Sequence, residues 1–523
     1  MNYRFIFNQL GLLLVVLSGV MLLVAGYEGW VYLRGGSAER DALIALLAAG
    51  GVGLVTGGIL WLVGRTPGPP RFGRREALLL VALSWLIGAA LAALPFWGWA
   101  LTASAAPADH PFTRFIDCYF EAMSGLTTTG ASILTNIEAL PRGLLLWRAL
   151  THWLGGLGIV VLFVAVLPSL GVGGKRLFFL ENSGPKQSGP TPHIRDTARI
   201  LWTIYLLLTF AQAAALRLCG MDWFDSFCHT FATLGTGGFS TRNASVGAYD
   251  SSAINWIIIL FMILGGVNFG LFHQLFRGSI ASVWKDTELR FYLLLIASGS
   301  AVIALSLITV EAPLIRSDVS AIAPEPGPAI EHAAFQAASI LTTTGFATAD
   351  FNQWPFPAKA VLVLFMFIGG CAGSTAGGIK VGRVWAVIKI LLMEVERVFA
   401  PKVIRPMRIG RAVIDPDVRL SIVVYALGMV LLFAIGAAAV MVLEAGTLHP
   451  HTGLPRCDFT TAATASVAAL CTIGPGLSAV GPLENYAWMT GPSKLLLALW
   501  MALGRLEVFA ILVLFVPRFW RAD

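Results

Sequence analysis

The chain has 523 residues, of which 57% are hydrophobic and only 12% are charged. Soluble domains are nearer a quarter charged, so this composition excludes a soluble multidomain protein, a disordered chain and a disulfide-rich scaffold. The mean hydropathy of +0.76 predicts instead a polytopic membrane protein embedded in a lipid bilayer. We attribute the net charge of +7 to cytoplasmic loops and not to the binding of nucleic acid.

Ten apolar stretches approach the length that is needed to cross a bilayer. They lie near residues 10–33, 43–63, 77–101, 149–170, 200–219, 253–275, 291–310, 358–393, 418–443 and 495–516. Alternate connecting segments, together with both termini, carry 24 of the 36 Lys and Arg residues. Because positive charge concentrates in cytoplasmic loops, we expect both termini to be cytoplasmic.

Four Thr/Gly-rich turns recur along the chain, each between two apolar spans and each after a short amphipathic segment. The turns are residues 127–132, 233–240, 342–347 and 471–478. Their alignment equates Gly130, Gly237, Gly345 and Gly474, at intervals of 107, 108 and 129 residues. An acidic residue precedes each glycine by 12 to 16 positions, which suits the start of a short helix: Asp117, Asp225, Glu331 and Asp458.

This repeat predicts an all-α fold in which four span–pore-helix–span units surround one pore with fourfold pseudo-symmetry. An N-terminal two-helix hairpin, residues 1–70, lies outside the repeat. The four pore repeats are expected at residues 71–175, 176–285, 286–400 and 401–523. The third of them contains a Gly-rich intramembrane segment at 369–380.

The segments before the turns are too short to cross the membrane. Each would enter as a half-helix that directs its partly negative C-terminal end at the membrane centre. The turn would then return as non-helical backbone, which survives at that depth only where it lines a wet cavity or is packed in protein. One such turn would be an ordinary external loop, but four in register favour rings of carbonyl oxygens that replace the hydration shell of a monovalent cation.

The Gly-rich segment 369–380 interrupts the eighth apolar stretch, because small residues do not hold a helix there. The residues alone support two interpretations equally, an intramembrane loop below the third turn and a close crossing of helices. Arg505 lies inside the last span, where a charge is costly unless it faces water or a partner. We expect it to face the pore. The alternative is an internal ion pair, for which Glu507 is poorly placed because i,i+2 side chains diverge.

Several motifs resemble the Trk/Ktr/HKT superfamily of potassium transporters, and most closely the TrkH/TrkG type of bacterial Trk system. They are residues 123–131, 152–158, 167–174, 237–241, 342–346, 373–380, 474–477 and 504–507. The additional N-terminal hairpin favours this ten-span type over the eight-span Ktr type. The resemblance implies potassium uptake across the bacterial cytoplasmic (inner) membrane, with K⁺ as the transported ion and no organic cofactor in this chain.

The resemblance also implies which residues bind the ion and which gate its path. The ion-binding set is Thr128, Thr129, Gly130, Thr236, Gly237, Thr343, Thr344, Gly345, Thr472, Ile473 and Gly474. The gate is Gly369, Gly370, Gly373, Ser374, Thr375, Gly377, Gly378 and Lys380, together with Arg505 as a barrier. Glycine at position 130, where some relatives that prefer sodium carry serine, favours potassium. The second turn, with Gly235 before Thr236, departs from the usual pattern of the family.

No nucleotide-binding motif occurs in the chain, so regulation by a nucleotide would need another subunit. The resemblance implies a homodimer docked on a cytosolic, TrkA-like nucleotide-binding subunit. Basic segments 171–199, 277–290 and 394–419 are the expected contact surface.

Two other classes of function fit the sequence less well. A secondary transporter with broken helices, coupling K⁺ to H⁺ or Na⁺, would be expected to show inverted repeats, whereas these repeats are parallel. An intramembrane enzyme would need a catalytic motif, and the sequence has no H-E-x-x-H, G-x-S-x-G, P-loop or paired intramembrane Asp. We therefore predict that the chain is not an enzyme. Three further polar residues, Glu121, His152 and Asn268, are expected to serve packing or hydrogen bonding.

Overall fold

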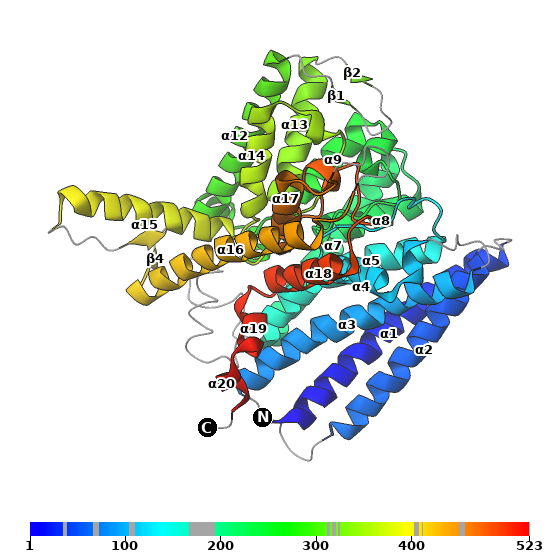
Figure 1. The fold of residues 1–523 in the computed structure, drawn as a ribbon. Coiled ribbons are helices and arrows are strands. Elements are labelled where there is room, and N and C mark those ends of the chain that lie inside the picture. The colour runs from blue at the N-terminus through cyan, green and yellow to red at the C-terminus, as the bar shows by residue number, and fades with distance from the viewer. Residues whose placement is uncertain are drawn as a thin grey trace.

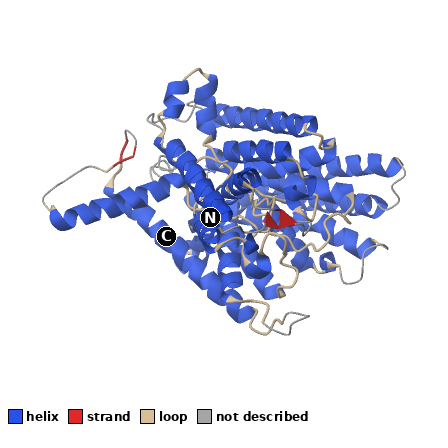
Figure 2. Cartoon of the chain, turned by 90° about the horizontal axis from the view of Figure 1, so that it is seen from above, coloured by secondary structure: helices blue, strands red, loops and turns tan. Residues whose placement is uncertain are grey.

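The computed structural model describes residues 1–34, 39–65, 73–103, 110–166, 194–310, 314–315, 321–322, 325–401, 407–409, 412–448 and 455–521. These residues form an almost entirely helical protein (Figures 1 and 2). Two short antiparallel strand pairs are the exception: β1 (Leu314–Ile315) with β2 (Ala321–Ile322), and β3 (Arg408–Ile409) with β4 (Ala412–Val413). The predicted all-α class is therefore confirmed.

Three long helices form the N-terminal part, α1 (Tyr3–Leu33), α2 (Glu39–Val63) and α3 (Arg74–Thr102), and they lie side by side (Figure 1). Glycines let the backbones of α1 and α2 come into direct contact. A Cβ on Gly11 would lie 2.4 Å from the Trp61 nitrogen and 2.5 Å from the Gly57 carbonyl oxygen. Small residues at a crossing are typical of helices that associate within a membrane.

Four short helices each follow a long helix and end at one of the Thr/Gly-rich turns. They are α4 (Phe115–Leu126), α8 (Trp223–Leu234), α13 (Pro326–Leu341) and α17 (Phe459–Leu470). The long helices before them are α3, α7 (Ile194–Leu218), α12 (Thr287–Thr309) and α16 (Pro416–Leu443). The helices after the turns are α5 (Arg142–Val166), α9 (Ser252–Gly265), α14 (Phe356–Phe367) and α18 (Gly491–Arg505). Each short helix thus carries its turn into the middle of the molecule.

Shorter elements connect these helices. The α-helices are α10 (Phe269–Phe276), α11 (Ile280–Trp284), α15 (Val381–Phe399), α19 (Phe509–Leu512) and α20 (Pro517–Trp520). The 3-10 helices are η1 (Pro111–Thr113), η3 (Ser245–Tyr249), η4 (Phe351–Gln353), η5 (Ser478–Val480) and η6 (Val513–Phe515).

Two predicted spans are not continuous helices. The stretch 253–275 bends by 96° between α9 and α10, and the stretch 495–516 bends by 115° after α18. Asn268 starts a new helix by accepting the Gly270 N–H at 2.8 Å, whereas Glu507 and Val508 have φ of 53° and 61°, which no α-helix continues. The predicted interruption of 358–393 is present, since α14 ends at Phe367 and α15 begins at Val381.

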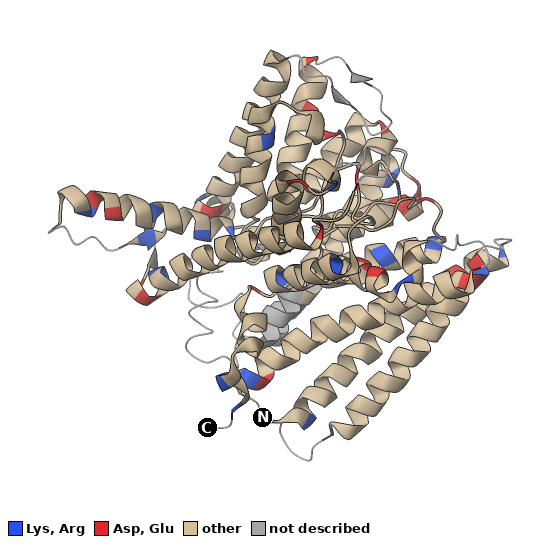
Figure 3. Ribbon diagram, viewed as in Figure 1, with Lys and Arg blue, Asp and Glu red and all other residues tan. Residues whose placement is uncertain are grey.

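The exposed surfaces of the long helices are apolar along their middles. Leu23, Val55, Leu305 and Leu431 are each at least 61% exposed, and Lys, Arg, Asp and Glu are sparse there in Figure 3. In the described residues, six helices are long and apolar enough to cross a membrane, or eight if each bent pair is one span. These features define an integral membrane protein. The motif at 167–174 and most of basic segment 171–199 lie outside the described residues.

Candidate functional site

The four turns share one unusual backbone geometry. The first residue after each helix cap is a threonine in the left-handed region, with φ of 54° to 55°: Thr128, Thr236, Thr343 and Thr472. Two residues later a glycine also has positive φ, between 77° and 98°: Gly130, Gly238, Gly345 and Gly474. A β-branched residue with positive φ is a genuine outlier, and such strain concentrates at functional sites.

One hydrogen bond recurs in all four turns. The residue between the threonine and the glycine donates its N–H to a carbonyl five residues earlier, at 2.8 Å in every turn. The pairs are Thr129 to Ser124, Gly237 to Ala232, Thr344 to Ser339 and Ile473 to Ala468. This is the six-to-one bond of a Schellman helix ending, which normally uses glycine where these turns use threonine.

The positive φ angles correct the alignment of the second turn. Gly238, and not Gly237, is the equivalent of Gly130, whereas Gly237 corresponds to Thr129. The sequence alignment was therefore displaced by one residue in this turn, because Gly237 and Gly238 are adjacent and the pattern alone does not distinguish them. Gly237 has its own constraint, since a Cβ there would lie 1.9 Å from Nδ1 of His152.

The four turns contact one another in cyclic order. A Cβ on Gly130 would lie 1.9 Å from the carbonyl oxygen of Gly237, and a Cβ on Gly238 would lie 2.1 Å from that of Thr344. The series continues from Gly345 to the Ile473 oxygen at 1.9 Å, and it closes from Gly474 to the Thr129 oxygen at 2.6 Å. Each glycine thus packs against a carbonyl of the next turn, which leaves no room for a side chain. We call this arrangement the glycine ring.

A cavity of about 120 Å³ borders the glycine ring. All four glycines line it, together with the segments that follow them, including Arg148, Asn243 and Tyr486. Tyr486 fixes one wall, because its hydroxyl donates to the Gly474 carbonyl at 2.8 Å and its N–H donates to the Ser132 carbonyl at 2.9 Å.

The Gly-rich loop, residues 368–380, contacts the threonines of the turns. The Gly377 N–H donates to Oγ1 of Thr343 at 2.7 Å, and a Cβ on Gly377 would lie 2.0 Å from Oγ1 of Thr472. The predicted Gly-rich segment therefore forms a loop, and this loop touches the third and fourth turns. The cavity borders the glycines and the loop borders the threonines, so they lie at different ends of the turns.

The loop is closed at its base and fastened to neighbouring helices. The Gly369 N–H donates to the Ile379 carbonyl at 2.9 Å, which brings its two ends together. The Cys371 N–H donates to the Gly266 carbonyl at 2.8 Å, and the Gly373 carbonyl accepts from the Phe269 N–H at 3.2 Å. The remaining predicted gate residues of the loop are buried within it: Gly370, Ser374, Thr375, Gly378 and Lys380, whose ammonium donates to the Ala376 carbonyl.

Arg505 is the last residue of α18 and is only 2% exposed. Its guanidinium donates to the Thr375 carbonyl in the loop at 2.7 Å and to the Gly155 carbonyl of α5 at 3.0 Å. Glu507 pairs instead with Arg383 at 2.9 Å, as the divergence of i,i+2 side chains predicts. Arg505 therefore joins three segments that follow different turns.

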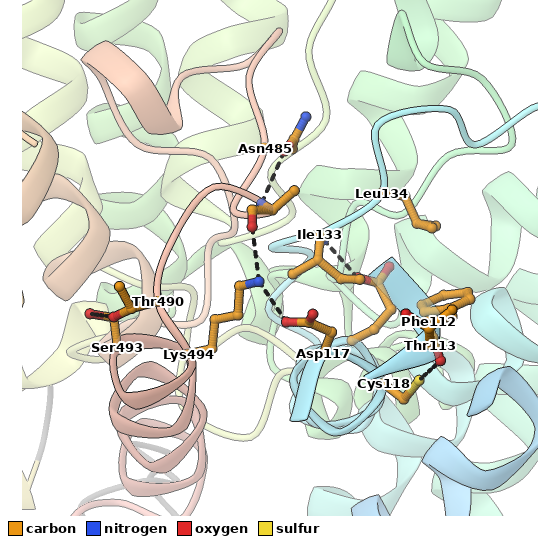
Figure 4. Close-up of polar contacts among 12 residues, drawn as sticks. Phe112, Thr113, Asp117, Cys118, Ile133, Leu134, Asn485, Thr490, Ser493 and Lys494 are labelled. Carbon is orange, nitrogen blue, oxygen red and sulfur yellow. Dashed lines mark hydrogen bonds and ion pairs between the residues drawn. The ribbon is translucent and has the colours of Figure 1, made fainter. Parts of the chain in front are cut away.

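Sequence reasoning missed two buried ion pairs beside the turns. Lys494 of α18 meets Asp117 of α4 at 2.5 Å (Figure 4), and Arg148 of α5 meets Glu121 of α4 at 2.6 Å. The available signal for both was a lone Lys or Arg directly before a predicted apolar span, 149–170 for Arg148 and 495–516 for Lys494. Glu331 also differs from expectation: it is the sixth residue of α13 rather than its start, and it accepts from Asn255 of α9.

The Glu121–Arg148 pair connects two neighbouring turns. Glu121 accepts from the Ser132 hydroxyl and the Ile133 N–H, each at 2.9 Å, after the first turn. Arg148 donates to the Ser240 carbonyl at 2.9 Å after the second turn. The pair therefore braces the two segments that line the cavity, and Glu121 has the hydrogen-bonding role expected of it.

We expect Glu121→Gln to cost about 3–5 kcal/mol of folding stability, because it leaves the Arg148 cation buried without its anion. The measurement is thermal unfolding of the purified protein, with Glu394→Gln as the control, since the Glu394–Arg397 pair is more than half exposed. The double variant Glu121→Gln/Arg148→Gln should recover part of the loss. A melting temperature equal to that of the Glu394 control would contradict the brace.

Comparison with known proteins identifies the class of this molecule. A family model described as TrkH, a cation transport protein, matches residues 98–522. The chain is 36% identical to the Trk system potassium uptake protein TrkH of Escherichia coli K12 over 524 residues, which is all of both chains. It is 32% identical to TrkG of the same organism over 86% of each chain.

The fold agrees with these sequence matches. The crystal structure of the potassium transporter TrkH from Vibrio parahaemolyticus superposes with a TM-score of 0.83, at 32% identity and over all of both chains. The molecule is thus a membrane transport protein and not an enzyme, as predicted. More particularly, the chain belongs to the TrkH family of cation transport proteins, which confirms the resemblance inferred from its motifs.

Proposed function

We propose that this protein takes up potassium across the bacterial cytoplasmic membrane and that the glycine ring is its selectivity filter. The membrane potential, worth about 2.3 kcal/mol per charge per 100 mV, would drive entry of the cation. Relatives that match the whole chain are named potassium uptake proteins, which supports K⁺ as the transported ion.

The cyclic contact between each glycine and the next turn's carbonyl is the observation that carries this proposal. It puts the carbonyls of Thr129, Gly237, Thr344 and Ile473 around one closed ring. Carbonyl rings replace the hydration shell of a dehydrated monovalent cation. The four short helices end at these turns, and their partly negative C-termini add to the attraction. The proposed ion-binding residues are those predicted from the sequence, with Gly238 added.

The Gly-rich loop and Arg505 form the proposed gate. The loop touches Thr343 and Thr472, so it would obstruct the path just beyond the filter. Arg505 joins the loop to α5 and adds a positive charge that repels an arriving cation. Opening would require the loop to leave these contacts.

We extend the proposal to the assembly and its topology. The chain would cross the membrane ten times with both termini cytoplasmic, as a hairpin (1–70) and four pseudo-symmetric pore repeats (71–175, 176–285, 286–400 and 401–523). It would act as a homodimer with a cytosolic, TrkA-like nucleotide-binding subunit. The relatives are named as potassium uptake proteins of Trk systems, which supports a membrane subunit of such a system.

Ion flux into proteoliposomes tests the proposal. Rubidium uptake into vesicles that contain the purified chain should exceed that of empty vesicles and should be reduced by external K⁺ far more than by Na⁺. Uptake that follows the imposed membrane potential, without a pH or Na⁺ gradient, supports a conduit. Uptake that requires such a gradient would support the alternative, a secondary transporter that couples K⁺ to H⁺ or Na⁺. Absence of Rb⁺ uptake would contradict both.

A further inference from the structure

Glu288 connects the start of α12 to the Gly-rich loop. It is the second residue of α12 and only 3% exposed. One carboxylate oxygen accepts the Ala372 N–H at 2.8 Å and the Gly382 N–H at 3.0 Å. Ala372 lies in the first half of the loop, and Gly382 lies in the first turn of α15, just after the loop ends. A single buried oxygen thus binds both sides of the loop.

Two cations lie near this contact, on the loop's exit. Lys380 donates to the Ala376 carbonyl and also interacts electrostatically with Glu288, and Arg383 pairs with Glu507. The partners of Glu288 are backbone N–H groups, one of them at the N-terminus of α15, where the helix dipole favours an anion. Hydrogen bonds from amides to a buried carboxylate are about twice as strong as neutral ones.

Glu288 and Arg505 hold the loop through opposite kinds of group. The carboxylate of Glu288 binds loop N–H groups from α12, whereas the guanidinium of Arg505 binds the Thr375 carbonyl from α18. The loop backbone is otherwise Gly-rich and supplies few side chains that could fasten it. Its position therefore depends on residues contributed by neighbouring helices.

We propose that Glu288 is a positioning residue that latches the Gly-rich loop in its obstructing position. This inference rests on the proposed function, in which the loop gates the path of the ion. Loss of the latch frees both sides of the loop at once, and it raises ion flux without changing the filter. A residue with only a structural role would lower flux together with stability.

The test is Rb⁺ uptake by proteoliposomes that contain the full chain with Glu288→Ala, Glu288→Gln or no substitution. We expect Glu288→Ala to raise the initial rate at least about tenfold, because it removes two charge-assisted hydrogen bonds from the closed state and the loss of one alone corresponds to about that factor. Glu288→Gln keeps an oxygen that accepts both N–H groups, so its rate should lie between those of Glu288→Ala and the wild type. Competition by K⁺ and Na⁺ should be unchanged in both.

Asp286→Ala is the matched control. Asp286 caps the same helix by accepting the Leu289 N–H at 2.9 Å, so its loss weakens the start of α12 without removing a bond to the loop. An equal rise in flux for Asp286→Ala would overturn the latch. Rates at or below the wild-type rate for folded Glu288 variants would also overturn it, and Glu288→Gln decides alone if Glu288→Ala does not fold. Wild-type vesicles without Rb⁺ uptake would instead refute the proposed function.

Discussion

Substitution of Gly345 by alanine is expected to abolish the discrimination between K⁺ and Na⁺ and to reduce Rb⁺ uptake at least about tenfold. The backbone of Gly345 has φ of +80°, a region in which an L-residue costs about 1–2 kcal/mol. The new Cβ would also lie 1.9 Å from the Ile473 carbonyl oxygen, which must move. Because that carbonyl is a proposed ion ligand, its displacement disturbs the proposed filter directly. Uptake competition in proteoliposomes measures both effects.

Gly327 supplies the control within the same repeat. It lies in the first turn of α13, and nothing stands within 4 Å of a Cβ built there. Gly327→Ala should therefore leave uptake and selectivity at the wild-type level. If Gly345→Ala behaved like Gly327→Ala, the glycine ring would not determine selectivity.

Removal of the Arg505 guanidinium should have the opposite effect and raise Rb⁺ uptake at least about tenfold. Arg505→Ala deletes the bonds to the Thr375 and Gly155 carbonyls, and so frees the loop from α5 and α18. It also deletes a repulsion of about 4 kcal/mol for two like charges about 4 Å apart at an effective dielectric constant of about 20. Selectivity should remain, because the glycine ring is untouched. The initial rate of uptake at fixed membrane potential measures the change.

Arg397→Ala removes the same charge from an exposed position on α15 and is the matched control. Arg397 is 56% exposed and pairs with Glu394, three residues before it on the same helix. Neither residue belongs to the loop. Its uptake should equal that of the wild type. A wild-type rate for Arg505→Ala would mean that Arg505 is a structural link and not part of a barrier.

The sequence was sufficient to predict the helical membrane fold and the four turns, because both depend on local patterns. Long apolar runs specify the helices, and Thr-Gly steps after a short amphipathic segment specify the turns. The end of the helix at Phe367 could also be predicted, since consecutive glycines and small residues do not hold a helix.

Features that depend on tertiary contacts could not be predicted from local sequence patterns. One example is which of two adjacent glycines, Gly237 or Gly238, is equivalent to the glycines of the other turns. This depends on which of them packs against the Thr344 carbonyl of the next turn. The bends after Gly265 and Arg505 arise where the helices meet the loop, because Gly266 and Arg505 both form hydrogen bonds with it. Partners such as Asp117 and Lys494 are 377 residues apart, a pairing that no spacing rule contains.

The location of bound ions tests the central claim most directly. An experimental structure determined in Rb⁺, with anomalous scattering to identify the ion, should show Rb⁺ inside the glycine ring, in contact with the carbonyls of Thr129, Gly237, Thr344 and Ile473. Replacement of Rb⁺ by Na⁺ should remove that peak. Rb⁺ bound elsewhere, with an empty ring in a protein that still transports it, would contradict the account.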